Sequence, residues 1–101
     1  MTSKERAYLM KLASGEPSII QIGRAGVTPE LTQNVEEALA ARELIKLGVV
    51  QNCPYDAREM AQTLAERTRA QVVQIIGRKI VLYREGRDKK KKIEFPREKK
   101  G

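Results

Sequence analysis

Near its N-terminus the chain reads Ser18-Ile-Ile-Gln-Ile-Gly-Arg-Ala-Gly-Val-Thr-Pro29. The isoleucine-rich run over residues 18–22 is short and typical of a strand. Gly23-Arg24-Ala25-Gly26 follows as a tight loop, because glycine tolerates backbone conformations that other residues avoid. Thr28 is a good helix N-cap, and Pro29 suits the first helical position. The segment therefore predicts a strand, a glycine loop and a capped helix in succession.

Further elements are indicated on both sides of this segment. Upstream, Thr2 and Glu5 have the spacing of a capping box and begin a predicted helix that ends near Gly15. Downstream, the helix after the glycine loop is expected to run to about Arg42. Residues 43–50 form a second predicted strand. Its side chains alternate, with Ile45, Leu47 and Val49 on one face and Lys46 and Gly48 on the other.

The second half of the chain predicts one more helix and a hairpin. Asp56 and Glu59 have capping spacing, and residues 57–68 show the clearest helical period in the chain. The apolar face of that helix would consist of Ala57, Met60, Ala61, Leu64, Ala65 and Thr68. The β-rich runs over residues 72–76 and 80–84 flank Gly77-Arg78, which predicts a hairpin with a short turn.

The predicted order is α-β-α-β-α-β-β, an α/β sandwich with a four-stranded mixed sheet. Two β-α-β units imply parallel pairing with right-handed crossovers, and the final hairpin adds an antiparallel pair. Residues 1–85 are expected to form one folded domain. Residues 86–101 are expected to form a basic, flexible tail, since they offer little to bury apart from Ile93 and Phe95.

The charge of the chain favours a polyanionic partner. Lys and Arg number 20 and Asp and Glu number 13 among 101 residues, a net charge of +7. Residues 84–101 hold nine basic and four acidic residues, a net +5, so the tail supplies most of the excess. Such a balance suits nucleic acid or an anionic membrane.

Several classes of function lack their sequence signals. Cys53 is the single cysteine and histidine is absent, so an internal disulfide, a His/Cys metal cluster and His-based acid–base catalysis are excluded. No apolar run approaches the ~20 residues of a membrane span, and no signal peptide is evident. A cytoplasmic protein without a cofactor is expected. The glycine loop also lacks the P-loop pattern of nucleotide-binding enzymes, and no catalytic carboxylate pair stands out, so an enzyme is not expected.

The glycine loop has the chemistry of a phosphate site. Glycines allow close approach of a ligand, the following helix offers N–H groups and a positive dipole end, and Arg24 adds charge and donors. KH domains clamp a nucleic-acid backbone with a G-x-x-G loop. The motif alone is weak, because a tight turn before a helix would have the same sequence. Both interpretations stay open on these residues alone.

Four elements together closely resemble the CRM domain, and most closely its bacterial stand-alone YhbY-type members. They are Gly23-Arg24-Ala25-Gly26, Ala38-Leu39, Glu43-Leu44-Ile45-Lys46 and Ile76-Gly77-Arg78-Lys79-Ile80-Val81-Leu82-Tyr83-Arg84. The resemblance covers about residues 2–84. It implies a fold similar to the C-terminal domain of translation initiation factor three. It also implies RNA binding with the glycine loop on the backbone, and a role with precursors of the large ribosomal subunit.

The candidate RNA-binding residues are Gly23, Arg24, Ala25, Gly26, Lys46, Arg78 and Lys79. Family members often have lysine inside the loop, where this chain has Arg24, and both residues suit phosphate. Lys46 could equally be an ordinary solvent-facing strand residue, and charged hairpin turns such as Arg78 and Lys79 are common. Lys89, Lys90, Lys91 and Lys92 could form a nonspecific electrostatic arm or only a solubilising tail. The four scattered aromatic residues predict no stacking platform, so recognition should depend on shape and backbone.

The sequence therefore favours a noncatalytic RNA-binding protein, expected to be a monomer, that acts in large-subunit assembly. The alternative is a module that docks on an acidic protein partner through its lysine-rich tail, because that tail holds most of the net charge.

Overall fold

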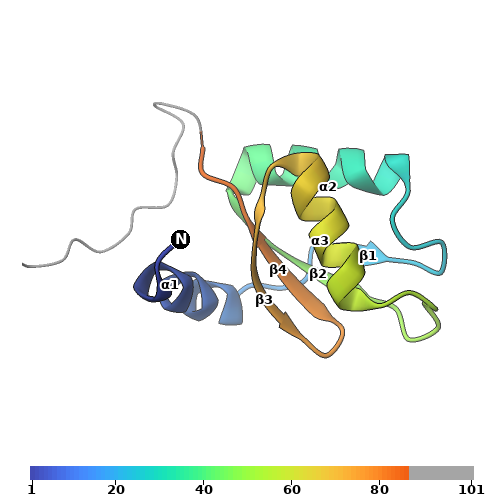
Figure 1. Cartoon of the computed structure of the whole chain (residues 1–101), viewed down its shortest axis with the longest axis horizontal. Coiled ribbons are helices and arrows are strands. Elements are labelled where there is room, and N and C mark those ends of the chain that lie inside the picture. Colours follow the sequence, from blue (N-terminus) through green and yellow to red (C-terminus); the bar gives the residue numbers. More distant parts are fainter. Residues whose placement is uncertain (87–101) are drawn as a thin grey trace, which may run out of the picture.

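The computed structural model describes residues 1–86 (Figure 1). Residues 87–101, including the predicted arm Lys89–Lys92, lie outside the described residues. The described elements are α1 (Ser3–Ser14), β1 (Ile20–Ile22), α2 (Pro29–Arg42), β2 (Leu44–Val49), α3 (Ala57–Thr68), β3 (Gln71–Ile76) and β4 (Lys79–Tyr83). No helix within residues 1–86 is long and apolar enough to cross a membrane.

The four strands form one mixed sheet in the order β1-β2-β4-β3, which confirms the predicted fold class. β1 and β2 are parallel, as expected for a β-α-β unit, and β4 is antiparallel to both of its neighbours. The prediction was wrong in one respect, because β2 and β3 run in the same direction but do not pair. β4 lies between them. It is buried from Ile80 to Tyr83, whereas β3 is largely half-buried or exposed, so the more apolar strand occupies the interior.

Side chains of the central strands alternate between two hydrophobic clusters, one on each face of the sheet. The larger cluster lies under α2 and α3 and includes Ile45, Leu47, Val49, Ile80 and Leu82. The smaller cluster lies under α1 and joins Leu9 and Ala13 to Leu44, Val73, Val81 and Tyr83. The predicted alternation along β2 is therefore confirmed, and each face of that strand packs in one of the two clusters.

Local signals account for the helix starts. Thr2 forms the predicted capping box with Glu5, and the side chains of Thr28 and Asp56 accept the N–H groups of Leu31 and Glu59. Each capping side chain satisfies a donor that no helical carbonyl could reach.

Two arginines join elements of the domain that are distant in sequence. Arg6 of α1 donates through Nη1 to the Val72 and Val73 carbonyls, at 3.1 and 2.8 Å, where a register shift interrupts the β3–β4 ladder. After β4, Arg84 forms an ion pair of 2.7 Å with Glu36 and donates to the Thr68 carbonyl. These contacts hold α1 and the end of β4 against the rest of the domain.

Buried Glu43 joins α2 to the chain after β4. It has a φ of 65°, its carbonyl accepts the N–H of Arg84, and its carboxylate accepts the N–H of Gly86. Burial of a carboxylate is costly unless it is hydrogen-bonded, so this contact has a structural purpose.

Candidate nucleic-acid interface

The Gly23–Gly26 loop is a tight turn closed by a hydrogen bond of 3.0 Å from the Gly26 N–H to the Gly23 carbonyl. Arg24 and Ala25, at its tip, are exposed. Among residues 1–86, their backbone N–H groups meet no acceptor, and the Arg24 side chain forms no hydrogen bond or ion pair. The turn therefore presents two N–H donors and a free guanidinium to solvent, a set that suits phosphate oxygens.

The start of α2 offers fewer free N–H donors to an anion than its sequence suggested. Pro29 has no N–H, and the N–H of Leu31 is taken by the Thr28 hydroxyl at 3.0 Å. Glu30 also places a carboxylate in the first turn. The helix dipole still favours an anion nearby. The donors available to a phosphate nevertheless come mainly from the loop.

Three chain segments meet at this end of the sheet. The Val50 N–H donates to the Ile22 carbonyl at 3.0 Å, next to the glycine loop. The Arg78 guanidinium donates to the Val50 carbonyl at 3.1 Å, and the Arg78 carbonyl accepts from the Val49 N–H. Figure 1 shows the β1–α2 and β2–α3 loops at the same end of the molecule. Val50 therefore links the glycine loop to the β3–β4 turn.

The other two candidate lysines lie on the α1 side of the sheet. Lys79 is exposed, and its ammonium donates to the Ser18 hydroxyl at 3.2 Å. Lys46 is half-buried and donates to the Ala13 and Glu16 carbonyls at the end of α1, at 3.3 and 3.4 Å. A cation there complements the C-terminal end of a helix. Lys46 thus has a structural contact, and Arg24 alone among the four candidate cations has none within residues 1–86.

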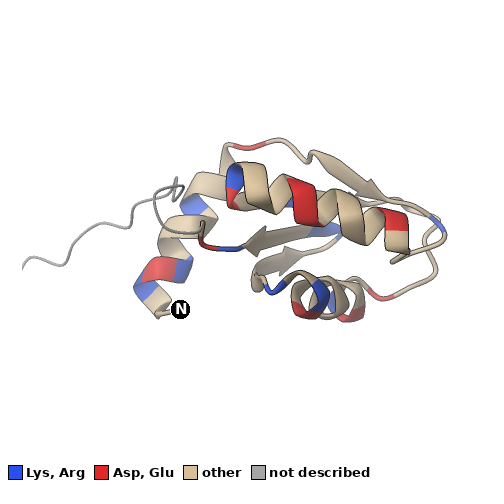
Figure 2. Cartoon of the chain, turned by 90° about the horizontal axis from the view of Figure 1, so that it is seen from above, with Lys and Arg blue, Asp and Glu red and all other residues tan. Residues whose placement is uncertain are grey.

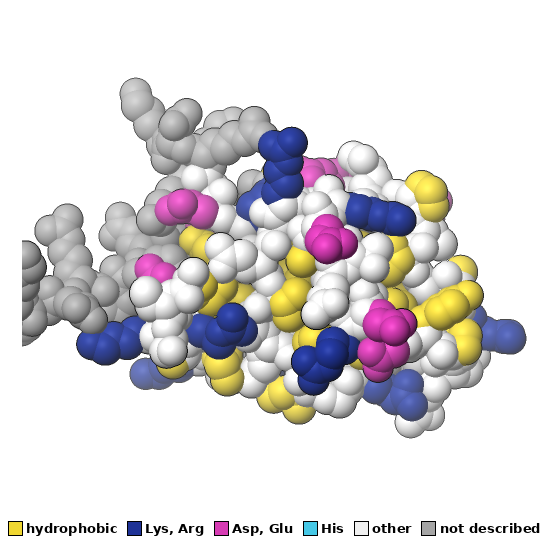
Figure 3. Space-filling model, in the orientation of Figure 1, with side chains coloured by type: hydrophobic (Ala, Val, Ile, Leu, Met, Phe, Trp, Pro, Cys, Tyr) yellow, Lys and Arg dark blue, Asp and Glu magenta, His cyan; other side chains and the backbone are white. Residues whose placement is uncertain are grey.

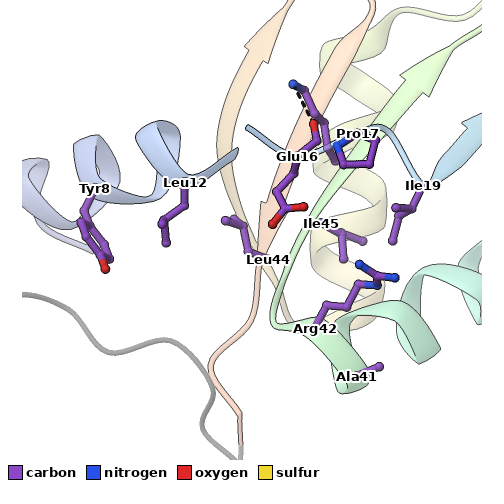
Figure 4. Close-up of a pocket in the computed structure, with 10 residues that line it drawn as sticks. Tyr8, Leu12, Glu16, Pro17, Ile19, Ala41, Arg42, Leu44 and Ile45 are labelled. Carbon is purple, nitrogen blue, oxygen red and sulfur yellow. Dashed lines mark hydrogen bonds between the residues drawn. The ribbon is translucent and has the colours of Figure 1, made fainter. Parts of the chain in front are cut away.

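Lys46 also borders a cavity of about 470 Å³ between α1 and the end of α2. Figure 4 shows Leu12, Ile19 and Ile45 reaching it from three different segments. Among the described residues that line this cavity, Lys46 is the one that also belongs to the predicted site.

Tyr55 also lies at this end of the molecule, although no pattern in the sequence predicted its place there. Its ring covers Gly26, which is buried and has a φ of 71°. An ideal Cβ on Gly26 would lie 2.6 Å from Tyr55 Cδ2. The residue is nevertheless 55% exposed, so part of the ring is open to solvent. Only the sheet topology, which places the loops after β1 and β2 together, could have indicated this contact.

The surface around the loop carries both signs of charge. Arg24, Arg78 and Lys79 are accompanied by Asp56 and Glu59 at the start of α3. Figure 2 shows acidic and basic residues interspersed along the helices. Among residues 1–86, no cluster of His, Cys, Asp and Glu could hold a metal ion. A ligand would therefore be selected by local geometry more than by a uniform basic field.

Comparisons with known proteins agree with the fold. A sequence model of the CRS1/YhbY (CRM) domain matches residues 1–84. The chain is 42% identical over 96 residues to "Probable RNA-binding protein YqeI" of Bacillus subtilis, covering 95% of this chain and 99% of that one. It is 30% identical to an "RNA-binding protein" of Haemophilus influenzae, with 96% of each chain covered.

A solved structure shares the same fold. The solution structure of a hypothetical Staphylococcus aureus protein, described as "a putative RNA binding protein", superposes with a TM-score of 0.79. Its sequence is 43% identical, and the match covers 95% of this chain and 99% of that one.

Proposed function

The chain belongs to the CRS1/YhbY (CRM) domain family, and we propose that it is a noncatalytic RNA-binding protein whose Gly23–Gly26 loop holds the RNA backbone. The names of its relatives support RNA as the partner. One observation carries the assignment of the loop. At its tip, the N–H groups of Arg24 and Ala25 and the Arg24 guanidinium are exposed and have no acceptor within residues 1–86.

The remaining candidates would extend this contact. Arg78 and Lys79 stand at the same end of the sheet and can neutralise neighbouring phosphates while keeping their protein hydrogen bonds. Lys46 would contribute to RNA binding mainly through its charge, since its ammonium already donates hydrogen bonds to carbonyls at the end of α1. The loop is therefore the primary grip and the other cations are secondary.

The test is binding to fragments of large-subunit ribosomal RNA across a salt series. Arg24→Glu should weaken binding at least about tenfold and reduce the slope of log K against log salt by about one, because one phosphate contact is lost. Lys11→Glu, an exposed residue of α1, makes the same charge change away from the loop. Equal losses in the two variants would mean that net charge alone drives binding, and the loop assignment would fail. Circular dichroism of both variants is the control for correct folding.

Truncation separates this proposal from docking on an acidic protein through the lysine-rich tail. A chain ending at Gly86 keeps the hydrogen bond from Gly86 to Glu43 and loses Lys89–Lys92. RNA binding by the loop predicts weaker but persistent binding. Complete loss would favour the tail as the whole interface.

We further propose that the RNA belongs to precursors of the large ribosomal subunit, and that the protein acts in the cytoplasm as a monomer. The family resemblance supports this setting. Sedimentation of cell extract tests it: the protein should accompany large-subunit precursors and leave them when Arg24 is replaced by Glu. Migration with mature ribosomes only, or with neither, would contradict the proposed setting.

A further inference from the structure

We propose that Tyr55 and the cavity beside it hold one unpaired nucleobase of the bound RNA. This inference rests on the proposed function, because it takes the Gly23–Gly26 loop as the site of the adjoining backbone. It adds a preference among bases to a contact that the sequence had assigned to backbone and shape alone.

The first support is the position of the Tyr55 ring. Its contact with buried Gly26 fixes the ring against the loop that would grip phosphate, while 55% of the residue is exposed. Bases of single-stranded RNA commonly stack on such aromatic side chains. Figure 3 shows hydrophobic side chains at the surface of this end of the molecule, with charged side chains around them.

The second support is a cavity of about 350 Å³ next to the ring. Its apolar lining comes from Ala25, Val27, Tyr55 and Met60. Ala25 is itself a residue of the glycine loop, so the cavity opens directly beside the proposed backbone grip. The volume falls in the range of small-molecule sites, and the thioether of Met60 packs well against aromatic rings.

The third support is the polar side of the cavity. It is formed by Glu59, Thr63 and Arg67, which follow one another at four-residue intervals along α3 and therefore share one face. Within residues 1–86, no hydrogen bond or ion pair occupies these three side chains. Apolar walls with a few polar groups along one side are the arrangement that holds and orients a planar ligand.

The charge of Glu59 indicates which part of the nucleotide enters. A carboxylate repels phosphate but accepts hydrogen bonds from base amino groups. The base, and not its phosphate, should therefore face α3. Adenine and cytosine carry an exocyclic amino group and uracil has none, so Glu59 should favour the first two.

The experiment measures binding of short single-stranded oligoadenylate, oligocytidylate and oligouridylate at low salt. The variants are Tyr55→Leu, Tyr55→Phe, Glu59→Gln and Arg24→Glu. Leucine keeps an apolar cover over Gly26 but lacks an aromatic face, so affinity should fall about tenfold. Phenylalanine should bind as the natural residue does. Glu59→Gln should reduce the preference for adenine and cytosine over uracil.

The results separate this inference from the proposed function. If Arg24→Glu weakens binding and Tyr55→Leu does not, the nucleobase site is wrong and the loop remains. If neither weakens binding, both are wrong. If the unaltered protein binds ribosomal RNA fragments but none of the single strands, or shows no preference against uracil, the nucleobase site is again wrong.

A second readout avoids any dependence on the folding of Tyr55→Leu. An oligonucleotide carrying 2-aminopurine, whose fluorescence is quenched by stacking, is titrated with the unaltered protein. Quenching on binding is expected, and unchanged fluorescence at saturation would overturn the proposal.

Discussion

The ring of Tyr55 covers Gly26 so closely that a Cβ on Gly26 would lie 2.6 Å from Tyr55 Cδ2. Gly26 also has a φ of 71°, a conformation that costs other residues about 1–2 kcal/mol. The loop after β2 therefore shapes the glycine loop after β1. The two loops, which are distant in sequence, behave as one structural unit at the proposed interface.

Gly26→Ala should destabilise the domain by about 2 kcal/mol or more, since both the backbone and the ring oppose a methyl group. Urea unfolding measures the loss. In a Tyr55→Ala background the same substitution should cost less stability, because only the strain of the positive φ at residue 26 remains. Purely additive losses in the double variant would contradict the steric contact between the two residues.

Gly23→Ala should leave stability within about 1 kcal/mol, because a Cβ there meets no atom within 4 Å and φ is not positive. RNA affinity should nevertheless fall about fivefold or more, as the methyl group holds the ligand backbone away from the loop. Urea unfolding and RNA titration of the same preparation provide the two readouts. Unchanged RNA affinity would show that no ligand approaches Gly23 closely.

The different requirements for glycine at positions 23 and 26 could not be predicted from the sequence. A tight turn and a phosphate clamp each favour glycine at both positions. The structure separates them: Gly26 is required by its φ and by Tyr55, and Gly23 is not required by the fold at all. No local pattern distinguishes the two positions, since the difference depends on a residue from another loop.

The elements themselves were predictable because their signals are local. Capping residues such as Thr28 and Asp56 mark helix starts, and the alternation along residues 44–49 marks the strand β2. The position of β4 and the contact of Lys46 with the end of α1 depend on tertiary packing. Periodicity contains no information about either.

Stability should fall as pH rises above about 10. Burial, with added repulsion from the Glu43, Glu85 and Glu5 carboxylates, raises the pKa of Tyr83 to about 12. The unfolded chain then loses the phenolic proton first, at its ordinary pKa of about 10, so stability present below pH 10 is lost as pH rises toward 12. The loss of stability from this group should be a little over about 1 kcal/mol by pH 11.

Urea unfolding between about pH 8 and 11 checks this prediction, with Tyr83→Phe as the comparison. The phenylalanine variant has no proton to lose at this position and should show a shallower decline. Parallel curves for the two proteins would mean that Tyr83 titrates alike in the folded and unfolded states.

Arg6→Ala should cost about 1–2 kcal/mol, because it leaves the Val72 and Val73 carbonyls without their shared donor. Amide exchange should accelerate in α1 more than in α3, since Arg6 joins α1 to β3. Lys11→Ala, on the same helix, is the control and should change neither quantity appreciably. Uniform acceleration over both helices would show that α1 does not open by itself.

The interior place of β4 has a consequence for synthesis of the protein. β4, the last strand within residues 1–86 to leave the ribosome, must pair with β2 and β3, which have already been synthesised. Until it emerges, β2 and β3 each expose the edge that pairs with β4, and unpaired strand edges favour aggregation. The domain should therefore gain its stability in one late step, and a nascent chain stalled before Lys79 should remain sensitive to protease while one stalled well after Gly86 resists it.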